Sequence, residues 1–182
     1  MTIKKEKMKK IILAVIIAFS ANVANAQNFC IGGSTSFWNN ESGDRTTVSV
    51  TPDIGYTLSN KWYLGVGIGY KYTKQEDIKI NSFTLNPYAR YSYFAAGKVR
   101  LFVDGTFGIA NDKQKGKDSD FAWQIGLKPG VIIGLTERFS LAAHFGFLGY
   151  RDADNDINSL GEKGWGLDLS GNSLGFGFFY SF

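Results

Sequence analysis

The single histidine of the chain, His144, is the side chain best suited to acid–base chemistry near neutral pH. A hydrolase built on it would need a serine within hydrogen-bond reach of the imidazole. His144 alternates with the apolar residues Leu141, Ala143, Phe145 and Phe147, and so belongs to the opposite, polar face of its segment. We therefore expect a structural histidine in a polar interior, no catalytic residue, and a protein that is not an enzyme.

Two further motifs resemble binding sites. The run Asp152-Ala-Asp154-Asn-Asp156 resembles the start of a calcium loop, but Ile157 stands at the glycine position and Lys163 at the glutamate position. It predicts a solvated acidic loop, with weak bridging of divalent ions as the alternative. The glycines at 65, 67 and 69 follow a strict alternation with no helix after them, unlike a nucleotide-binding loop. We expect no metal site and no cofactor.

Apolar residues recur at every second position through most of the chain. A helix cannot give this period, whereas a strand with one apolar and one polar face does. The clearest runs cover 47–58, 64–72, 83–93, 101–109, 121–133, 141–147 and 173–182, and a weaker first run lies near 29–38. The pattern predicts eight strands.

The second face of these strands carries Gly, Ser, Thr and several charges, which would be costly at the centre of a small soluble barrel. Turning the barrel inside out places the apolar face in lipid and the small polar residues in a narrow lumen. The barrel must also close, because an open edge in hydrocarbon leaves backbone groups unpaired. We therefore predict an all-β fold, a closed eight-stranded antiparallel up-and-down transmembrane β-barrel; a periplasmic β-sandwich is the alternative. The expected lumen ionic cluster consists of Asp53, Lys71, Arg90, Asp104, Lys128 and His144.

The N-terminus has the features of an export signal. Five lysines precede the apolar run 11–19, and Ala24-Asn25-Ala26 supplies a small-x-small cleavage pattern. We expect residues 1–26 to be a cleaved signal peptide, with a retained anchor as the alternative, and residues 27–182 to be the barrel domain. Without the five lysines and one glutamate of this leader, fifteen basic and fifteen acidic residues remain. Nucleic acid is therefore not an expected partner, and the lone Cys30 provides no internal disulfide.

The connections between the predicted strands alternate in length. Those near Asn60, Gly97 and Glu137 are tight, whereas 39–45, 73–81, 111–119 and 151–170 are longer and charged. Short turns at one end and long loops at the other are typical of outer-membrane barrels, with both termini on the periplasmic side. Aromatic residues near strand ends are expected to form interfacial girdles: Trp62, Tyr63, Tyr72, Tyr91, Tyr93, Trp123, Tyr150 and Trp165.

Prolines and the Gly97 turn give local predictions. Pro52, Pro87 and Pro129 each lie on the apolar face of a strand, where we expect bends or bulges because proline forfeits a ladder hydrogen bond. A hairpin centred on Gly97 places Arg90 opposite Asp104, Tyr91 opposite Val103 and Tyr93 opposite Leu101. The sequence therefore predicts an Arg90–Asp104 ion pair within a network that blocks the lumen and also includes Asp53, Lys128 and His144.

The stretch QIGLKPGVIIGLTERFSLAAHFGFLGY, from Gln124, resembles the family of small outer-membrane β-barrel domain proteins of Gram-negative bacteria, porin-like and similar in plan to OmpA-type and OmpW-type barrels. The C-terminal pattern Gly177-x-x-Tyr180-x-Phe182 resembles the assembly signal of such barrels, although Gly175 replaces the polar residue usual two places before that glycine. The resemblance implies location in the outer membrane and contact with the barrel-assembly machinery during biogenesis.

Three functions are compatible with these features. The first is a barrel plugged by its own side chains, with a structural or surface-contact role through its outer loops, set in outer-membrane lipid and lipopolysaccharide. The second is a narrow channel for small solutes or hydrophobic molecules. The third and weakest is a lipid-modifying enzyme. The sequence does not identify a loop partner, and no nucleic acid is expected.

Overall fold

The computed structural model of the chain describes residues 28–40, 45–75, 78–114, 118–154, 159–161, 163–169 and 174–182, and the predicted signal peptide lies outside them. Within these ranges the regular structure is almost entirely strand, and no helix is long and apolar enough to cross a membrane. The strands are β1 (Phe29–Asn40), β2 (Arg45–Thr57), β3 (Trp62–Gln75), β4 (Ile78–Ala96), β5 (Val99–Gln114), β6 (Ser119–Gly134), β7 (Phe139–Phe145), β8 (Phe147–Ala153), β9 (Gly164–Asp168) and β10 (Leu174–Ser181).

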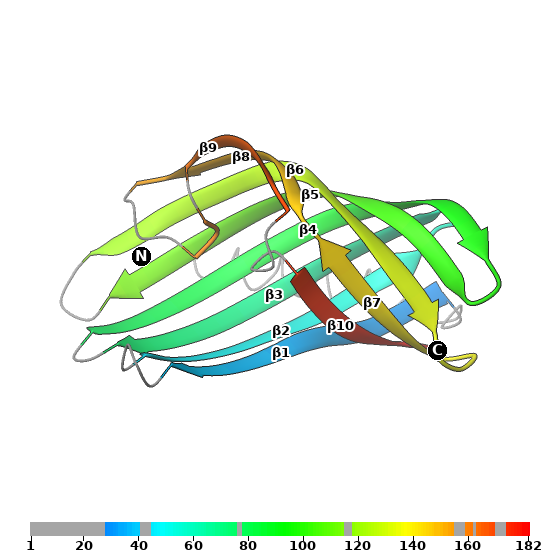
Figure 1. The fold of residues 1–182 in the computed structure, drawn as a ribbon, viewed down its shortest axis with the longest axis horizontal. Helices are drawn as coiled ribbons and strands as arrows, with labels where there is room; N and C mark the ends of the chain where they lie inside the picture. Colours follow the sequence, from blue (N-terminus) through cyan, green and yellow to red (C-terminus); the bar gives the residue numbers. More distant parts are fainter. Residues whose placement is uncertain are drawn as a thin grey trace, which may run out of the picture.

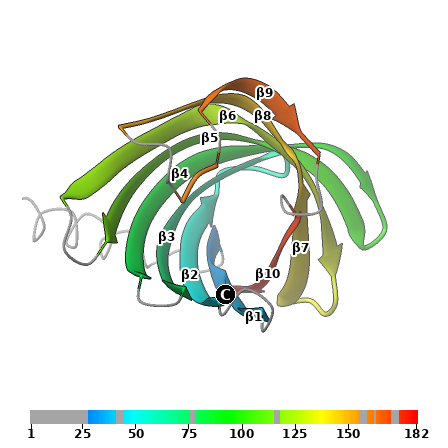
Figure 2. The ribbon, with the colours of Figure 1, turned by 60° about the vertical axis from the view of Figure 1, so that its left-hand side comes forward.

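The strands form one closed antiparallel barrel, as predicted. Each of β1 to β6 pairs with its sequence neighbours, and the ring closes where β1 pairs with β10 (Figure 2). The ten segments occupy eight strand positions around the barrel, which we call staves. Both β7 and β8 pair with β6, so they are successive parts of the seventh stave, while β10 pairs with β7 and β9 pairs with β8 in the eighth place (Figure 1).

The seventh stave is broken at Gly146, which the alternation did not predict. Gly146 has a φ of +90°, and a Cβ there would lie 2.8 Å from the Asp168 carbonyl oxygen, so glycine is required. The pairing with β6 shifts by one residue across this point. The shift reverses the parity of β8 relative to β7, so Phe147, expected on the lipid face, points inward and is only 3% exposed.

The three prolines behave differently from one another. The register shift at Gly146 lies opposite Pro129, as the predicted bulge requires. Pro52 has a ladder partner on β1 only, and Pro87 on β3 only, while the registers beyond them are unchanged. The predicted bulge is therefore absent at Pro52 and Pro87. Proline has no N–H to donate, and none is needed here because neither proline has a ladder partner on its second side.

The β4–β5 hairpin shows one predicted register and one error. Arg90 lies opposite Asp104 and Tyr91 opposite Val103, but Phe94, not Tyr93, lies opposite Leu101. The turn consists of Gly97 and Lys98, with Gly97 at a φ of +56°. A two-residue turn has its centre between two residues, which would place Arg90 and Asp104 one residue out of register. The bulge between Ser92 and Phe94 absorbs that residue and keeps both charges inward.

The expected long loops are largely strand. The β3–β4 ladder continues to Gln75–Ile78 and the β5–β6 ladder to Lys113–Ser119, and the expected loop 151–170 contains the end of β8 and all of β9. The extensions are polar on the outward face, where Lys74, Lys79 and Lys113 are exposed. Paired polar strands explain the length and charge that predicted loops. We call the end with these extensions the loop end and the opposite end the turn end.

The distribution of apolar residues is that of a protein surrounded by lipid. The buried hydrophobic residues among those described are four alanines and two phenylalanines. Most outward-facing large side chains are between about two fifths and four fifths exposed, a continuous apolar surface that a soluble protein does not tolerate. Members of this belt include Val50, Ile54, Leu64, Ile68, Phe83, Phe107, Ile125, Leu148, Phe176 and Phe178.

Five inward glycines on four strands provide room for aromatic rings of neighbouring strands. A Cβ on Gly130 would clash with Cζ of the Phe102 ring and would lie 2.6 Å from the Ala143 carbonyl oxygen. Four further pairs repeat this arrangement: Tyr63 against Gly55, Tyr88 against Gly65, Phe147 against Gly126, and Phe179 against Gly32. The rings therefore fill the lumen only because the adjacent residue has no side chain.

We predict that Gly130→Ala destabilises the barrel by about 1–3 kcal/mol, because the added methyl group overpacks Phe102 against a backbone that cannot move. Gly175→Ala is the matched control, since nothing lies within 4 Å of a Cβ on this inward residue. Urea unfolding in lipid vesicles, followed by tryptophan fluorescence, measures both. Equal free energies of unfolding for the two variants would contradict the packing argument.

Candidate functional site

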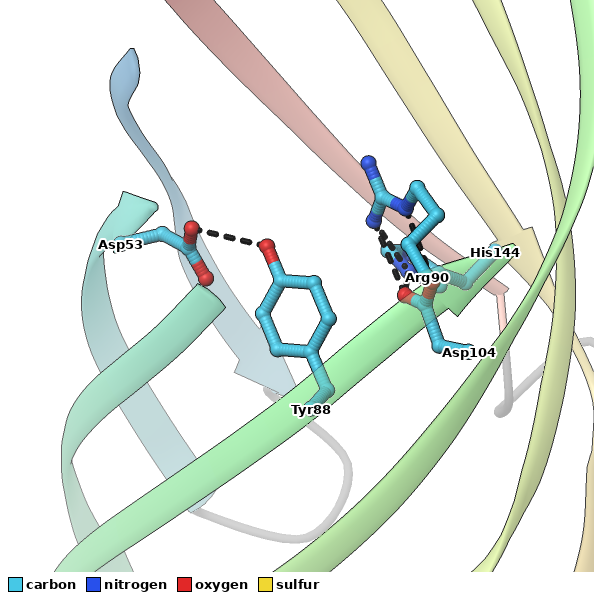
Figure 3. A network of polar contacts seen from close by, with 5 residues as sticks. All are labelled: Asp53, Tyr88, Arg90, Asp104 and His144. Atoms are coloured by element: carbon cyan, nitrogen blue, oxygen red, sulfur yellow. Dashed lines mark hydrogen bonds and ion pairs between the residues drawn. The ribbon is translucent and has the colours of Figure 1, made fainter. Parts of the chain in front are cut away.

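An ion pair between Arg90 and Asp104 lies at the centre of the lumen (Figure 3). Arg90 Nε donates to Asp104 Oδ1 at 2.8 Å, and Nη2 donates to Oδ2 at 2.9 Å. The two side chains are 5% and 3% exposed, and they occupy directly opposed positions of β4 and β5. A bidentate guanidinium–carboxylate pair is the geometry that best offsets the loss of hydration of two charges.

His144, on β7, completes a triad with this pair. Its Nε2 lies 2.8 Å from Asp104 Oδ2 and 3.3 Å from Arg90 Nη2. The guanidinium can only donate, so the shorter contact, in which Nε2–H donates to the carboxylate, fixes the role of this nitrogen. Asp104 therefore accepts hydrogen bonds from three donors on two side chains, and both its oxygens are occupied.

Aromatic rings surround the guanidinium of Arg90. Its Cζ lies 3.9 Å from the centroid of the Phe102 ring, and the rings of Tyr88, Tyr63 and Phe179 lie at 5.3, 5.5 and 5.9 Å. The rings stabilise the cation through their electron-rich faces and exclude water from it. Phe102 is fully buried.

Of the rings around Arg90, those of Phe102 and Phe179 were not singled out as lumen residues from the sequence. Tyr63 was expected in an interfacial girdle, which is wrong: it packs inward against Tyr88 at a centroid distance of 5.9 Å. Its place in the alternation indicated an inward side chain, because Tyr63 lies between the outward residues Trp62 and Leu64. Position near a strand end was a weaker guide than parity.

The other predicted cluster members differ in their links to the triad. Asp53 Oδ1 accepts a hydrogen bond of 2.9 Å from the Tyr88 hydroxyl, so it joins the triad through the ring beside Arg90 (Figure 3). Lys128 lies opposite Asp104 in the β5–β6 register. Its Nζ has no carboxylate oxygen within 4.0 Å in the part of the chain that the structure describes, because Asp104 is already occupied. Lys71 lines the chamber on the loop-end side.

Two chambers lie on either side of the triad. The loop-end chamber has a volume of about 550 Å³ and the turn-end chamber about 280 Å³. Of the residues that line them, only Phe179 belongs to both. We call Arg90, Asp104, His144, Phe102 and Phe179, the groups that separate the chambers, the plug.

A second obstruction lies at the loop end. The backbone N–H of Ser159 donates to Asp112 Oδ2 at 2.6 Å, which draws the segment 159–161 into the barrel mouth. Leu160 then packs against Ala110, Ala122 and Ala153, a small apolar cluster. The loop-end chamber is therefore lined by the plug at one end and by Ser159, Leu160 and Gly161 at the other.

The acidic segment after β8 forms a surface ion pair. Lys163 Nζ lies 2.6 Å from Asp152 Oδ1, and this hydrogen bond raises the pKa of the Lys163 ammonium. Asp154 Oδ2 accepts from the Phe121 N–H at 3.3 Å, and Asp156 lies outside the described residues. Within the described ranges, no group of three acidic, histidine or cysteine side chains could hold a metal ion.

The predicted assembly-signal residues lie on β10 and at the chain end beyond it. Gly177 is buried on the inward face, where the ring of Phe179 passes 3.1 Å from the position of a Cβ. Tyr180 faces outward, packs edge-to-face against Phe139 and Phe182, and accepts a hydrogen bond of 2.9 Å from Arg138 Nη1. The backbone N–H of Phe182 donates to the Phe29 carbonyl oxygen at 3.1 Å, at the seam where the barrel closes.

A closed barrel with a lipid-facing apolar belt and a polar lumen defines a transmembrane β-barrel of the outer membrane. Residues 11–182 match the family model of the outer membrane protein β-barrel domain, and the chain belongs to this family. No curated protein sequence matches the chain significantly.

Solved structures of outer-membrane barrels resemble the chain. The N-terminal β-barrel domain of Pseudomonas aeruginosa OprF aligns with a TM-score of 0.51 and 17% identity, over 86% of this chain and 98% of that one. A major outer membrane protein of Thermus thermophilus aligns with a TM-score of 0.44 and 13% identity, over 85% and 98% of the two chains. For OmpT, an outer membrane protein of Vibrio cholerae, the values are 0.42 and 15%, over 85% and 52%. At these identities the likeness to OprF shows the fold alone.

We predict that Asp104→Ala lowers the free energy of unfolding by about 3–5 kcal/mol, because Arg90 would remain buried without a counter-charge. The double variant Arg90→Met/Asp104→Leu should recover part of this loss by removing both charges. Asp118→Ala, at an exposed site near the loop end, is the control and should change stability by less than about 0.5 kcal/mol. Equal free energies of unfolding in urea for Asp104→Ala and Asp118→Ala would show that the ion pair does not stabilise the barrel.

Proposed function

We propose that this chain is a non-enzymatic outer-membrane barrel whose lumen is plugged, and that it serves the envelope structurally and through contacts of its loop end. The observation that carries the proposal is the plug, where one bidentate ion pair, a histidine and two phenylalanine rings separate the two chambers. The segment 159–161, with Leu160 packed in the barrel mouth, adds a second obstruction in the same lumen. A solute that crosses the barrel would have to displace both.

A narrow channel is the second candidate. The observation that favours it is that chambers lie on both sides of a plug made largely of side chains from β4, β5 and β7. Conduction would require Arg90 and Asp104 to separate, and each would then need another partner in a confined space. The tight geometry of the pair favours the closed state over the channel.

A lipid-modifying enzyme is the weakest candidate. His144 Nε2 contacts Asp104 and Arg90, and the described residues include no serine hydroxyl hydrogen-bonded to that nitrogen. An enzyme of this class needs its nucleophile within reach of the base. Turnover of phospholipid or lipid A by purified protein, lost in His144→Ala, would identify this activity.

The proposal includes an orientation. The turn end, where β1 begins and β10 ends, faces the periplasm, and the polar strand extensions of the loop end face outward among the lipopolysaccharide headgroups. Exposed lysines on the extensions, such as Lys74, Lys79 and Lys113, suit contact with such anionic groups. The outward aromatic residues Tyr180 and Phe182 would face the barrel-assembly machinery as the last strand inserts.

Planar-bilayer conductance tests the plugged state. We expect the wild-type protein to show no stable open level, whereas Arg90→Ala/Asp104→Ala/Leu160→Ala, which removes both charges of the plug and the side chain of the second obstruction, should conduct. Lys113→Ala/Asp118→Ala removes one cation and one anion from exposed loop-end positions and should behave as wild type. A steady open level in the wild-type protein would favour the channel.

A further inference from the structure

Two cations lie against one buried ring in the loop-end half of the lumen. The Cζ atom of Arg151 lies 4.2 Å from the centroid of the Phe147 ring, and Lys128 Nζ lies 5.8 Å from the same centroid. Phe147 is 3% exposed, and its inward position results from the register shift at Gly146. The broken seventh stave therefore brings Lys128 of β6 and Arg151 of β8 together.

Among the described carboxylates, one pairs with Arg151 and none with Lys128. Asp104, opposite Lys128, is occupied by Arg90 and His144, and Asp53 accepts from Tyr88. Asp168 Oδ2 lies 3.9 Å from Arg151 Nη1, at the limit of an ion pair. No described carboxylate lies within 4.0 Å of Lys128 Nζ. Both cations line the same recess, and two positive charges around a confined site attract an anion.

The recess beside these cations has the composition of an anion site. Its volume is about 260 Å³, enough for one small oxyanion and several waters, each of which takes roughly 30 Å³ in the liquid. No aspartate or glutamate is among its lining residues. Hydroxyl and amide groups that can donate hydrogen bonds line it together with three cations: Ser49, Thr51, Thr84, Asn86, Gln124, Lys71, Lys128 and Arg151.

We propose that this recess binds a phosphate group, with Lys128 and Arg151 as its main ligands. A tetrahedral dianion accepts hydrogen bonds from a guanidinium, an ammonium and several hydroxyl groups at once, and these donors are present on different walls of the recess. Gln124 Oε1 accepts from Arg151 Nε at 3.4 Å, which helps to orient the guanidinium. The phosphate group belongs either to free phosphate or to a lipid headgroup. The inference does not depend on whether the barrel conducts.

Calorimetric titration of inorganic phosphate into the purified full-length barrel in a zwitterionic detergent at low salt tests the site. We expect saturable binding that Lys128→Gln weakens roughly tenfold or more, since the change removes a charge-assisted hydrogen bond, one of the stronger polar contacts. Lys74→Gln is the matched control, because it removes the same charge from the exposed outward face of β3. Heat-modifiable mobility on gels verifies that each variant is folded.

A second arm identifies the source of the phosphate group. Nanodiscs containing lipid A are examined by ³¹P NMR with the wild-type protein and with Lys128→Gln. A ³¹P shift that requires Lys128, without binding of inorganic phosphate, assigns the site to a lipid headgroup and supports the proposal. Absence of both signals would overturn it, as would equal weakening in Lys74→Gln and Lys128→Gln.

Discussion

The interaction on which the rest of the structure depends is the bidentate pair between Arg90 and Asp104. Charges in a narrow lumen enclosed by lipid lose most of their hydration, and only close pairing with further hydrogen bonds offsets that loss. The pair satisfies this condition: it has two hydrogen bonds of its own, a third from His144 and the face of Phe102 against the guanidinium. The interior is filled by these charges and by rings such as Phe102 that pack against them, and most of the large apolar residues can then face outward.

The local irregularities of the barrel result from keeping these groups in the lumen. The bulge at Tyr93 corrects the register that the two-residue turn at Gly97 imposes, so that Arg90 and Asp104 both point inward. Gly130 leaves room for the ring of Phe102, and the shift at Gly146 turns Phe147 toward Arg151. Both register shifts occur where strict alternation would place a ring or a charge on the wrong face.

Strict alternation was sufficient to predict the barrel, because the barrel depends only on parity along the strands. The Arg90–Asp104 register was predicted correctly because the bulge at Tyr93 offsets the difference between the assumed turn centre and the real two-residue turn. The alternation failed for Phe147, because one extra residue at Gly146 reverses the parity, and the sequence alone does not show where a strand is interrupted. Tyr63 was misplaced because proximity to a turn was weighed above parity. Lys79 and Lys113 belong to paired strands beyond the apolar belt, and a polar strand has no apolar face by which to distinguish it from a loop.

Hydrogen exchange of side-chain Nε–H groups by NMR in micelles tests the central claim most directly. Arg90 Nε–H is bonded to a buried carboxylate, whereas Arg100, also in the β4–β5 hairpin, is exposed and serves as the internal reference. The account predicts a resolved Arg90 Nε–H signal whose exchange with water is at least about a hundredfold slower than that of Arg100, since opening must precede exchange and costs a few kcal/mol. Equal exchange rates for the two arginines would show that water reaches Arg90 freely and would contradict the plug.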